Sequence, residues 1–205
     1  MKAVILISGN GSNLQSIIDN ADRIDLQISC VISNNKHAFG LIRAASSKIQ
    51  TFIIDPELFN SKEAFDRELI SIINQHGVAL IILAGYMRVL TPLFVSHFFG
   101  KILNIHPSLL PKFPGLNTHQ KAIEASEKTH GVSVHFVTEE IDGGPVISQE
   151  SVSIEAEDTA KTLSDKVLKK EHVIYLKVIH WYTQGRLKLN NKLTATLDGK
   201  IICLK

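Results

Sequence analysis

The chain has 205 residues, of which 44% are hydrophobic and 20% are charged, and its net charge is +2 with the histidines neutral. This composition supports a buried core and excludes a disordered chain, while the nearly balanced charge gives no electrostatic footprint for nucleic acid. The longest apolar runs, such as Val78–Leu83, are too short to cross a bilayer. The apolar start of the chain ends in Gly9 without a cleavage site, so we expect a cytoplasmic protein that has no membrane partner.

Apolar runs and helical patterns alternate along the first hundred residues. Strands are predicted at Ala3–Ser8, Leu26–Ser33, Thr51–Ile54, Val78–Leu83 and Lys101–Ile105. Helices are predicted at Asn13–Asn20, Phe39–Lys48 and Ser61–Gln75, and Asn60 with Glu63 forms a capping-box-like start for the third. The alternation predicts an α/β fold with a doubly wound, mostly parallel sheet that carries helices on both faces.

The pattern changes after about residue 110. Three prolines make Pro107–Pro114 an irregular loop. Beyond it we predict a helix at Thr118–Ser126, strands at Val132–Val137 and Val146–Ile154, and a long helix at Asp158–Gln184. A β-hairpin is predicted to follow, with strands at Thr194–Leu197 and Ile201–Leu204 and its turn at Asp198-Gly199. No repeat, low-complexity tract or linker interrupts the chain, so we expect a single domain, residues 1–205, with halves 1–100 and 101–205.

The two cysteines, Cys30 and Cys203, both stand in apolar, strand-like surroundings. Neither has a CxxC or histidine-rich neighbourhood, which makes a disulfide framework and a zinc site equally poor interpretations. We therefore expect two buried thiols and no metal.

In a sheet of this kind, ligands bind at the carboxyl ends of the strands. The first such end carries Ser8-Gly9-Asn10-Gly11-Ser12-Asn13, whose small residues allow a ligand to approach the N–H groups at a helix start. A dinucleotide fingerprint would need a third glycine where Leu14 stands, so a single phosphate suits this loop better than a pyrophosphate. The alternative is a tight turn in which Ser12 or Asn13 caps the helix.

A second group of polar residues closes the fifth predicted strand. Asn104 and His106 are separated by one residue, so on an extended chain both side chains leave the same face. An amide beside an imidazole suits acyl transfer, because the amide stabilises a developing oxyanion while the imidazole moves a proton. A lone Asn-x-His pair is more often structural, but the proline-rich continuation makes this one distinctive.

A third group follows the strand that contains His135. The loop Thr138–Pro145 has two glycines and a proline that can carry Asp142 into a cleft. A carboxylate close to His106 would fix the tautomer of the imidazole and raise its pKa. The alternative is a solvated acidic hairpin.

At these residues the chain resembles the phosphoribosylglycinamide formyltransferases, members of the folate-dependent formyltransferase superfamily. The matching stretches run in order over nearly the whole length: Ile5–Gln15, Leu83–Arg88, Asn104–Gly115, His130–Val137 and Asp142–Ile147. The element His106–Pro111 marks the wider superfamily, and the glycine-rich first turn in a short chain narrows the resemblance to this family.

The resemblance implies a Rossmann-like formyltransferase fold, with a phosphate-binding half before residue 100 and a folate-binding and catalytic half after it. It implies transfer of the formyl group of 10-formyltetrahydrofolate, a co-substrate, to the primary amine of glycinamide ribonucleotide in purine biosynthesis, by direct amine attack and without a metal. The implied partners are these two small molecules, for a monomer or weak homodimer.

The resemblance also assigns roles to individual residues. The implied catalytic residues are Asn104, His106 and Asp142, with His135 in support. The implied ribonucleotide contacts are Gly11, Ser12 and Asn13 at the phosphate and Glu171 at the amine. The implied folate contacts are Asn104, the pocket residues Met87, Arg88, Val89 and Leu90, and the loop residues Thr138, Glu139, Glu140, Ile141 and Asp142. Lys62 stands where the family often has an arginine in contact with folate, and lysine lacks the bidentate fork.

Three other functions use parts of the same pattern. A formyltetrahydrofolate hydrolase would employ the same Asn/His/Asp set, but we expect it to carry a regulatory domain before the first strand, which here begins at Ala3. A transfer-RNA formyltransferase would need an additional basic C-terminal domain. A non-catalytic nucleotide-binding module would leave the convergence of Asn104, His106 and Asp142 without a purpose.

Overall fold

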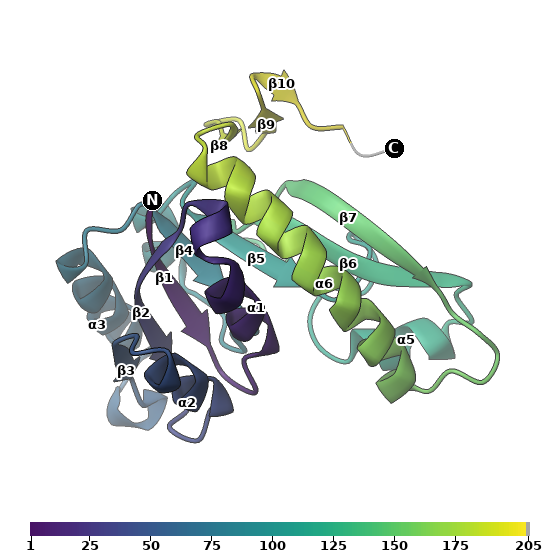
Figure 1. Ribbon diagram of the computed structural model, residues 1–205, viewed down its shortest axis with the longest axis horizontal. Helices are drawn as coiled ribbons and strands as arrows, with labels where there is room; N and C mark the ends of the chain where they lie inside the picture. Colours follow the sequence, from purple (N-terminus) through teal and green to yellow (C-terminus); the bar gives the residue numbers. More distant parts are fainter. Residues whose placement is uncertain (204–205) are drawn as a thin grey trace. The chain divides into compact units, whose positions relative to one another are not determined.

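The computed structural model describes residues 1–203, and Figure 1 shows their arrangement in helices and strands. The strands are β1 Lys2–Ile7, β2 Gln27–Ser33, β3 Thr51–Ile53, β4 Leu80–Leu83, β5 Ile102–His106, β6 Thr129–Phe136, β7 Val146–Ser153, β8 Leu187–Leu189, β9 Ala195–Leu197 and β10 Lys200–Ile201. The helices are α1 Ser12–Asn20, α2 Phe39–Ser46, α3 Lys62–Gln75, α4 Pro92–His97, α5 Thr118–Glu124 and α6 Ala160–Thr183, with short 3₁₀ turns at Asp22–Ile24 and Pro56–Leu58. Strands β1–β7 belong to a mostly parallel sheet, so the predicted α/β class is confirmed.

The packing of the backbone divides the chain into two compact units, and the first of them is Met1–Asn104. Its strands follow the order β3-β2-β1-β4-β5, and every neighbouring pair is parallel. The order reverses between β3 and β4, so right-handed crossovers place α3 on the opposite face from α1. Figure 1 agrees, with α1 in front of these strands and α3 fainter behind them.

The central strand of this unit, β1, is an uninterrupted apolar run because both of its faces are covered. Residues Ala3–Ile7 have no solvent exposure at all. Burial of that many aliphatic side chains contributes on the order of 2 kcal/mol for each, relative to leaving them in water. This strand therefore fixes the position of the glycine-rich turn that follows it.

The second unit begins at Ile105. Its main sheet pairing is the long antiparallel ladder of β6 with β7, whose register shifts at Val134/His135. Helix α6 packs along both of these strands and also contacts α5 and β8. A small antiparallel sheet, β10-β9-β8, follows α6, which confirms the predicted long helix and hairpin.

Some predicted details were wrong. The N-cap of α3 is Ser61, whose hydroxyl accepts from the Ala64 amide at 3.0 Å, so Asn60 does not begin the helix. Helix α4 was not predicted, because its six residues are too few to show a helical period. Cys30 is buried, and burial raises its pKa to about 12, but Cys203 is exposed beyond the hairpin. The predicted hairpin strand also reached Leu204, which lies outside the described residues.

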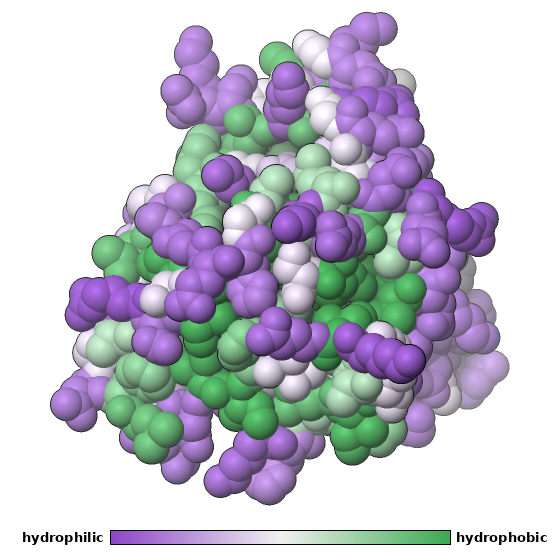
Figure 2. All heavy atoms as spheres, turned by 60° about the vertical axis from the view of Figure 1, so that its left-hand side comes forward, coloured by the Kyte–Doolittle hydropathy of each residue, from purple (hydrophilic) through white to green (hydrophobic). Residues whose placement is uncertain are grey.

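The surface mixes polar and apolar side chains. Figure 2 shows hydrophilic side chains over much of the face that it presents, with apolar groups visible between them. Among residues 1–203, no helix is both long enough and apolar enough to span a bilayer.

Candidate active site

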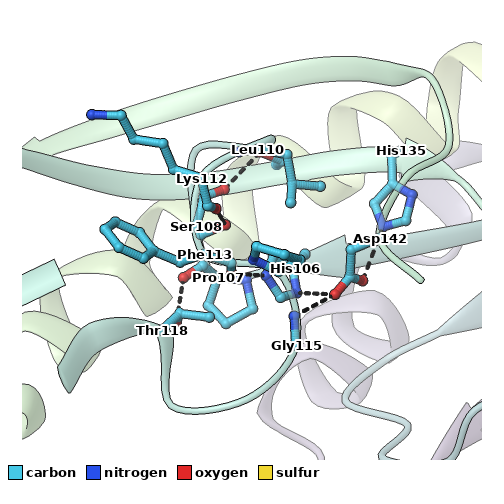
Figure 3. Close-up of polar contacts among 12 residues, drawn as sticks. His106, Pro107, Ser108, Leu110, Lys112, Phe113, Gly115, Thr118, His135 and Asp142 are labelled. Carbon is cyan, nitrogen blue, oxygen red and sulfur yellow. Dashed lines mark hydrogen bonds and ion pairs between the residues drawn. The ribbon is translucent and has the colours of Figure 1, made fainter. Parts of the chain in front are cut away.

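His106, Asp142 and His135 form the centre of the site in the second unit (Figure 3). One carboxylate oxygen of Asp142, Oδ2, lies 3.4 Å from His106 Nδ1 and accepts a hydrogen bond from the Gly115 amide at 2.8 Å. The other, Oδ1, lies 3.7 Å from Nε2 of His135. His106 comes from the end of β5, His135 from β6 and Asp142 from the loop after β6, so one carboxylate joins three separate segments.

The charges in this cluster oppose one another. Burial lowers the pKa of His106, while the Phe113 carbonyl, which lies 2.9 Å from Nε2, and the Asp142 carboxylate act to raise it. The net shift of the His106 pKa is downward in the free protein. Asp142 raises it as expected, but desolvation dominates. Burial also acts to raise the pKa of Asp142, but the hydrogen bonds from His135 and Gly115 and the nearby histidines bring it below its usual value.

Both ring nitrogens of His106 face oxygen atoms, one on Phe113 and one on Asp142. A neutral imidazole has only one N–H and can donate to just one of them, whereas the imidazolium donates to both. The two oxygen atoms therefore favour the imidazolium form of His106, whereas burial disfavours it. Such an arrangement is expected of an imidazole that becomes positively charged when a substrate places a negatively charged oxygen beside it.

The irregular loop after His106 is held by a buried serine that sequence analysis did not single out. The Ser133 hydroxyl donates to the Ser108 carbonyl at 2.6 Å and accepts from the Leu110 amide at 3.0 Å and from Gln149 Nε2 at 2.8 Å. These three bonds use the full capacity of a hydroxyl group. The available signal was the alternation on β6, where Gly131, Ser133 and His135 fall on one face between buried apolar residues.

A second pair of histidines lies close to this loop. The rings of His119 and His130 meet edge to face with centroids 5.1 Å apart, and Nδ1 of His119 and Nε2 of His130 are buried without a hydrogen-bond partner among the described residues. Burial, together with the positive charge that His130 and His106 can carry, lowers the pKa of His119 from 6.5 to about 4. This pair is therefore neutral at pH 7.

Acid is expected to destabilise the protein through His119. Between pH 6.5 and about 4 the unfolded chain binds a proton at this residue and the folded chain does not, so stability falls as the pH drops through that window. We expect the loss between pH 7 and 4.5 to be smaller by roughly 1–2 kcal/mol in His119→Gln, after allowance for partial solvent screening. Urea unfolding at both pH values measures this difference, and equal losses in the two proteins would contradict it.

In the first unit, the glycine-rich loop leads directly into the start of α1. The N-cap of α1 is Gly11, which has φ of 76° and no side-chain hydrogen bond, so neither Ser12 nor Asn13 caps the helix as the alternative interpretation required. A Cβ on Gly11 would lie 2.7 Å from Cα of Gly40. Glycine is thus needed at this position both for its positive φ and for close packing.

The segment Met87–Leu90 follows β4 in the same unit and is partly exposed. Met87 is 69% and Val89 52% exposed, whereas Leu90 is buried and the Arg88 guanidinium lies over the Phe65 ring at 4.2 Å. Exposed apolar side chains such as these two are suited to cover a flat heterocycle.

Polar side chains from elsewhere anchor this segment at both ends. Ser8 Oγ accepts a hydrogen bond from the Met87 amide at 2.8 Å and donates one to Asn34 at 2.6 Å. At the other end, Oδ2 of the fully buried Asp66 accepts from the Thr91 amide at 2.7 Å and from the Thr91 hydroxyl at 2.6 Å. The sequence pattern does not mark Asp66 as a functional residue, because its position on the apolar face of α3 indicates only that it is buried.

The other predicted residues occupy the following places. Asn104 stands two residues before His106 on β5 and is half-buried. Glu171 is buried on α6, whereas Lys62 is exposed at the first position of α3. Thr138, Glu139, Glu140 and Ile141 lie with Asp142 in the loop between β6 and β7, where Ile141 is 58% exposed. Among residues 1–203, no three His, Cys, Asp or Glu side chains are placed so that they could hold a metal ion together.

Comparisons with known proteins agree on one family. A family model described as formyl transferase matches residues 1–179. A phosphoribosylglycinamide formyltransferase of Escherichia coli is 50% identical over 202 residues, which cover 98% of this chain and 95% of the relative. The namesake in Haemophilus influenzae is 47% identical over 203 residues, with the same coverage. The solved structure of the enzyme of this name from Coxiella burnetii, in complex with CHES, has a TM-score of 0.95 at 47% identity and covers 99% of this chain and 96% of that one.

Proposed function

The chain belongs to the formyl transferase family, and we propose that the cluster of His106, Asp142 and His135, together with Asn104, is where it carries out its reaction. That reaction is transfer of the formyl group of 10-formyltetrahydrofolate to the primary amine of glycinamide ribonucleotide, which gives formylglycinamide ribonucleotide and tetrahydrofolate in purine biosynthesis. The observation that supports this location is the single carboxylate shared by His106, His135 and the Gly115 amide.

The proposed reaction proceeds by direct attack, without a covalent enzyme intermediate. The uncharged amine of the ribonucleotide forms a bond to the formyl carbon, and the carbonyl electron pair moves onto the formyl oxygen. The Asn104 amide and the His106 imidazole donate hydrogen bonds to this oxyanion. When the bond between the formyl carbon and N10 breaks, the proton released by the amine is delivered to N10.

The downward pKa shift of His106 adds a condition to this mechanism. In the free protein the ring is neutral at pH 7, because burial outweighs Asp142. The developing oxyanion supplies a second negative charge beside the ring and thereby favours the imidazolium, which forms when the ring takes up a proton from solvent. To donate to that oxyanion, Nε2 exchanges the Phe113 carbonyl for the formyl oxygen.

The substrate contacts are proposed on the resemblance to the family and on the local geometry of each unit. The phosphate of the ribonucleotide binds the backbone amides of Gly11, Ser12 and Asn13, where the helix start favours an anion. The buried carboxylate of Glu171 binds its amine. The pterin binds Met87–Leu90 and the loop of Thr138–Asp142, and Lys62 makes a single charged contact with folate in place of an arginine fork. The protein acts in the cytoplasm without a metal, as a monomer or weak homodimer.

The test is an absorbance assay for loss of the formyl group from 10-formyltetrahydrofolate, with and without glycinamide ribonucleotide. Turnover only in the presence of the ribonucleotide is the expected result. Turnover in its absence would identify a hydrolase, and binding of the ribonucleotide without any folate-dependent turnover would identify a nucleotide-binding module.

Asp66→Asn tests whether the anchored segment Met87–Leu90 binds folate. The amide keeps the shape of the carboxylate but weakens its charged hydrogen bonds to Thr91, so the segment loses its fixed end. We expect the KM for 10-formyltetrahydrofolate to rise about fivefold while the KM for the ribonucleotide stays within about twofold. Steady-state kinetics give both values, and Glu68→Gln, at an exposed position of the same helix, is the control. A loss of thermal stability with both KM values unchanged would show that Asp66 serves the fold alone.

A further inference from the structure

We propose that Arg43 is a positioning residue that holds the glycine-rich loop in its phosphate-binding shape. The proposal rests on the proposed function, which places the phosphate of the acceptor at Gly11–Asn13. Arg43 belongs to α2, far from the loop in sequence, and nothing in the motif itself indicates a role for it.

The guanidinium of Arg43 makes three hydrogen bonds, and all of them go to the loop or to the first turn of α1. Nε donates to the Asn10 carbonyl at 2.9 Å, Nη2 to Asn10 Oδ1 at 3.0 Å, and Nη1 to Gln15 Oε1 at 3.3 Å. Gln15 is itself oriented by Nε2, which donates to Asp19 Oδ1 at 2.8 Å and so turns Oε1 toward the guanidinium. A planar fork that grips both the main chain and the side chain of Asn10 leaves this residue little freedom.

The base of α2 supports the same loop at its glycines. The Gly40 amide donates to the Gly9 carbonyl at 3.1 Å. A Cβ at Gly11 would lie 2.7 Å from Cα of Gly40, and a Cβ at Gly40 would lie 2.5 Å from Cδ1 of Ile7 and 3.3 Å from Cα of Gly11. The Phe39 ring lies 4.9 Å from the guanidinium carbon of Arg43 and covers one face of it. Helix α2 therefore contacts each of the residues Gly9, Asn10 and Gly11.

The charge of Arg43 is not neutralised by an acidic partner. Among residues 1–203, no carboxylate lies within ion-pair distance of its guanidinium, whose hydrogen bonds all go to amide oxygens. A full positive charge thus stands beside a loop that is proposed to hold a phosphate dianion. Arg43 orders the loop through Asn10 and adds a favourable field for the anion.

The experiment compares two acceptors, glycinamide ribonucleotide and the same ribonucleoside without its phosphate. In Arg43→Met we expect the KM for the ribonucleotide to rise about tenfold, with kcat and the KM for the ribonucleoside within about twofold of the wild type. Arg43→Lys keeps the charge and one donor and is expected to recover part of the loss. The matched control is Arg23→Met, because Arg23 is exposed and donates a hydrogen bond to Asn20, away from the glycine-rich loop.

A second measurement separates positioning from direct contact with the phosphate. If Arg43 acts through Asn10, then Asn10→Ala raises the same KM, and the double variant is no worse than the more severe single variant. Additive effects of the two changes would overturn the positioning role. So would an Arg43→Met protein that loses thermal stability but keeps the phosphate preference of the wild type.

The result for the wild type separates the role proposed for Arg43 from the proposed phosphate site at Gly11–Asn13. A wild type that prefers the phosphorylated acceptor, with Arg43→Met preferring it equally, refutes the role of Arg43 and leaves the phosphate site standing. A wild type without any preference for the phosphate overturns both.

Discussion

Replacing Asp142 with asparagine is expected to lower kcat by about two orders of magnitude or more, on the scale usual for groups that support acid–base catalysis. The carboxylate is the part of the site that faces both His106 and His135, and it raises the pKa of His106 against the effect of burial. When the carboxylate charge is removed, the imidazolium of His106 loses its negatively charged partner, and the ring stays neutral as the oxyanion develops. The measurement is kcat under saturating concentrations of both substrates.

The control for this change is Asp165→Asn, since Asp165 is an exposed member of an i,i+4 pair with Lys161 on α6. Such a pair contributes only a few tenths of a kcal/mol, so activity should be close to that of the wild type. If Asp142→Asn were as active as this control, Asp142 would have no catalytic role. The thermal stability of the two variants should be compared as well, because Asp142 also accepts a hydrogen bond from the Gly115 amide and has a positive φ of 52°.

Replacing His106 with glutamine is expected to cause a loss at least as large as that of Asp142→Asn. Glutamine can still donate one hydrogen bond to the formyl oxygen but cannot become positively charged beside Asp142. We expect kcat to fall about a hundredfold or more while the KM values change only slightly, because the interaction is strongest in the transition state. Exposed His37, changed in the same way, is the control.

The double variant provides the sharper test. If His106 and Asp142 act as one unit, His106→Gln/Asp142→Asn should be hardly slower than His106→Gln alone. Multiplicative losses would mean that the two residues act independently, and near-wild-type turnover by His106→Gln would remove the imidazole from the mechanism.

The sequence predicted the fold because the residue patterns of the individual strands and helices agree with the way these elements pack. The run Ala3–Ile7 is apolar at every position, and only a strand covered on both faces needs that pattern. Gly9 and Gly11 follow this strand, and a helical pattern follows them. The loop of Gly11–Asn13 was therefore expected at the carboxyl edge of the sheet. Period two on β5 brought Asn104 and His106 to one face for the same reason.

Local sequence patterns did not predict the roles of side chains that bond to residues far away in the sequence. Ser133, Asp66 and Arg43 each bond to backbone or amide groups more than twenty residues away, and their own sequence neighbourhoods do not mark them. The sign of the His106 pKa shift belongs to the same class. A nearby carboxylate could be inferred from the sequence, but desolvation is a property of everything that covers the ring.

The sequence by itself thus determined the α/β class and the order of the strands and helices along the chain, and it predicted the residues that we propose carry the chemistry, because apolar periodicity and short motifs are local properties. Only the tertiary structure decided which atoms meet: Asp142 with two histidines and an amide, Ser133 with the loop after His106, and Arg43 with Asn10. These contacts join segments that are distant in sequence, and their distances and burial, on which the electrostatic energies depend, are fixed only when the segments pack together.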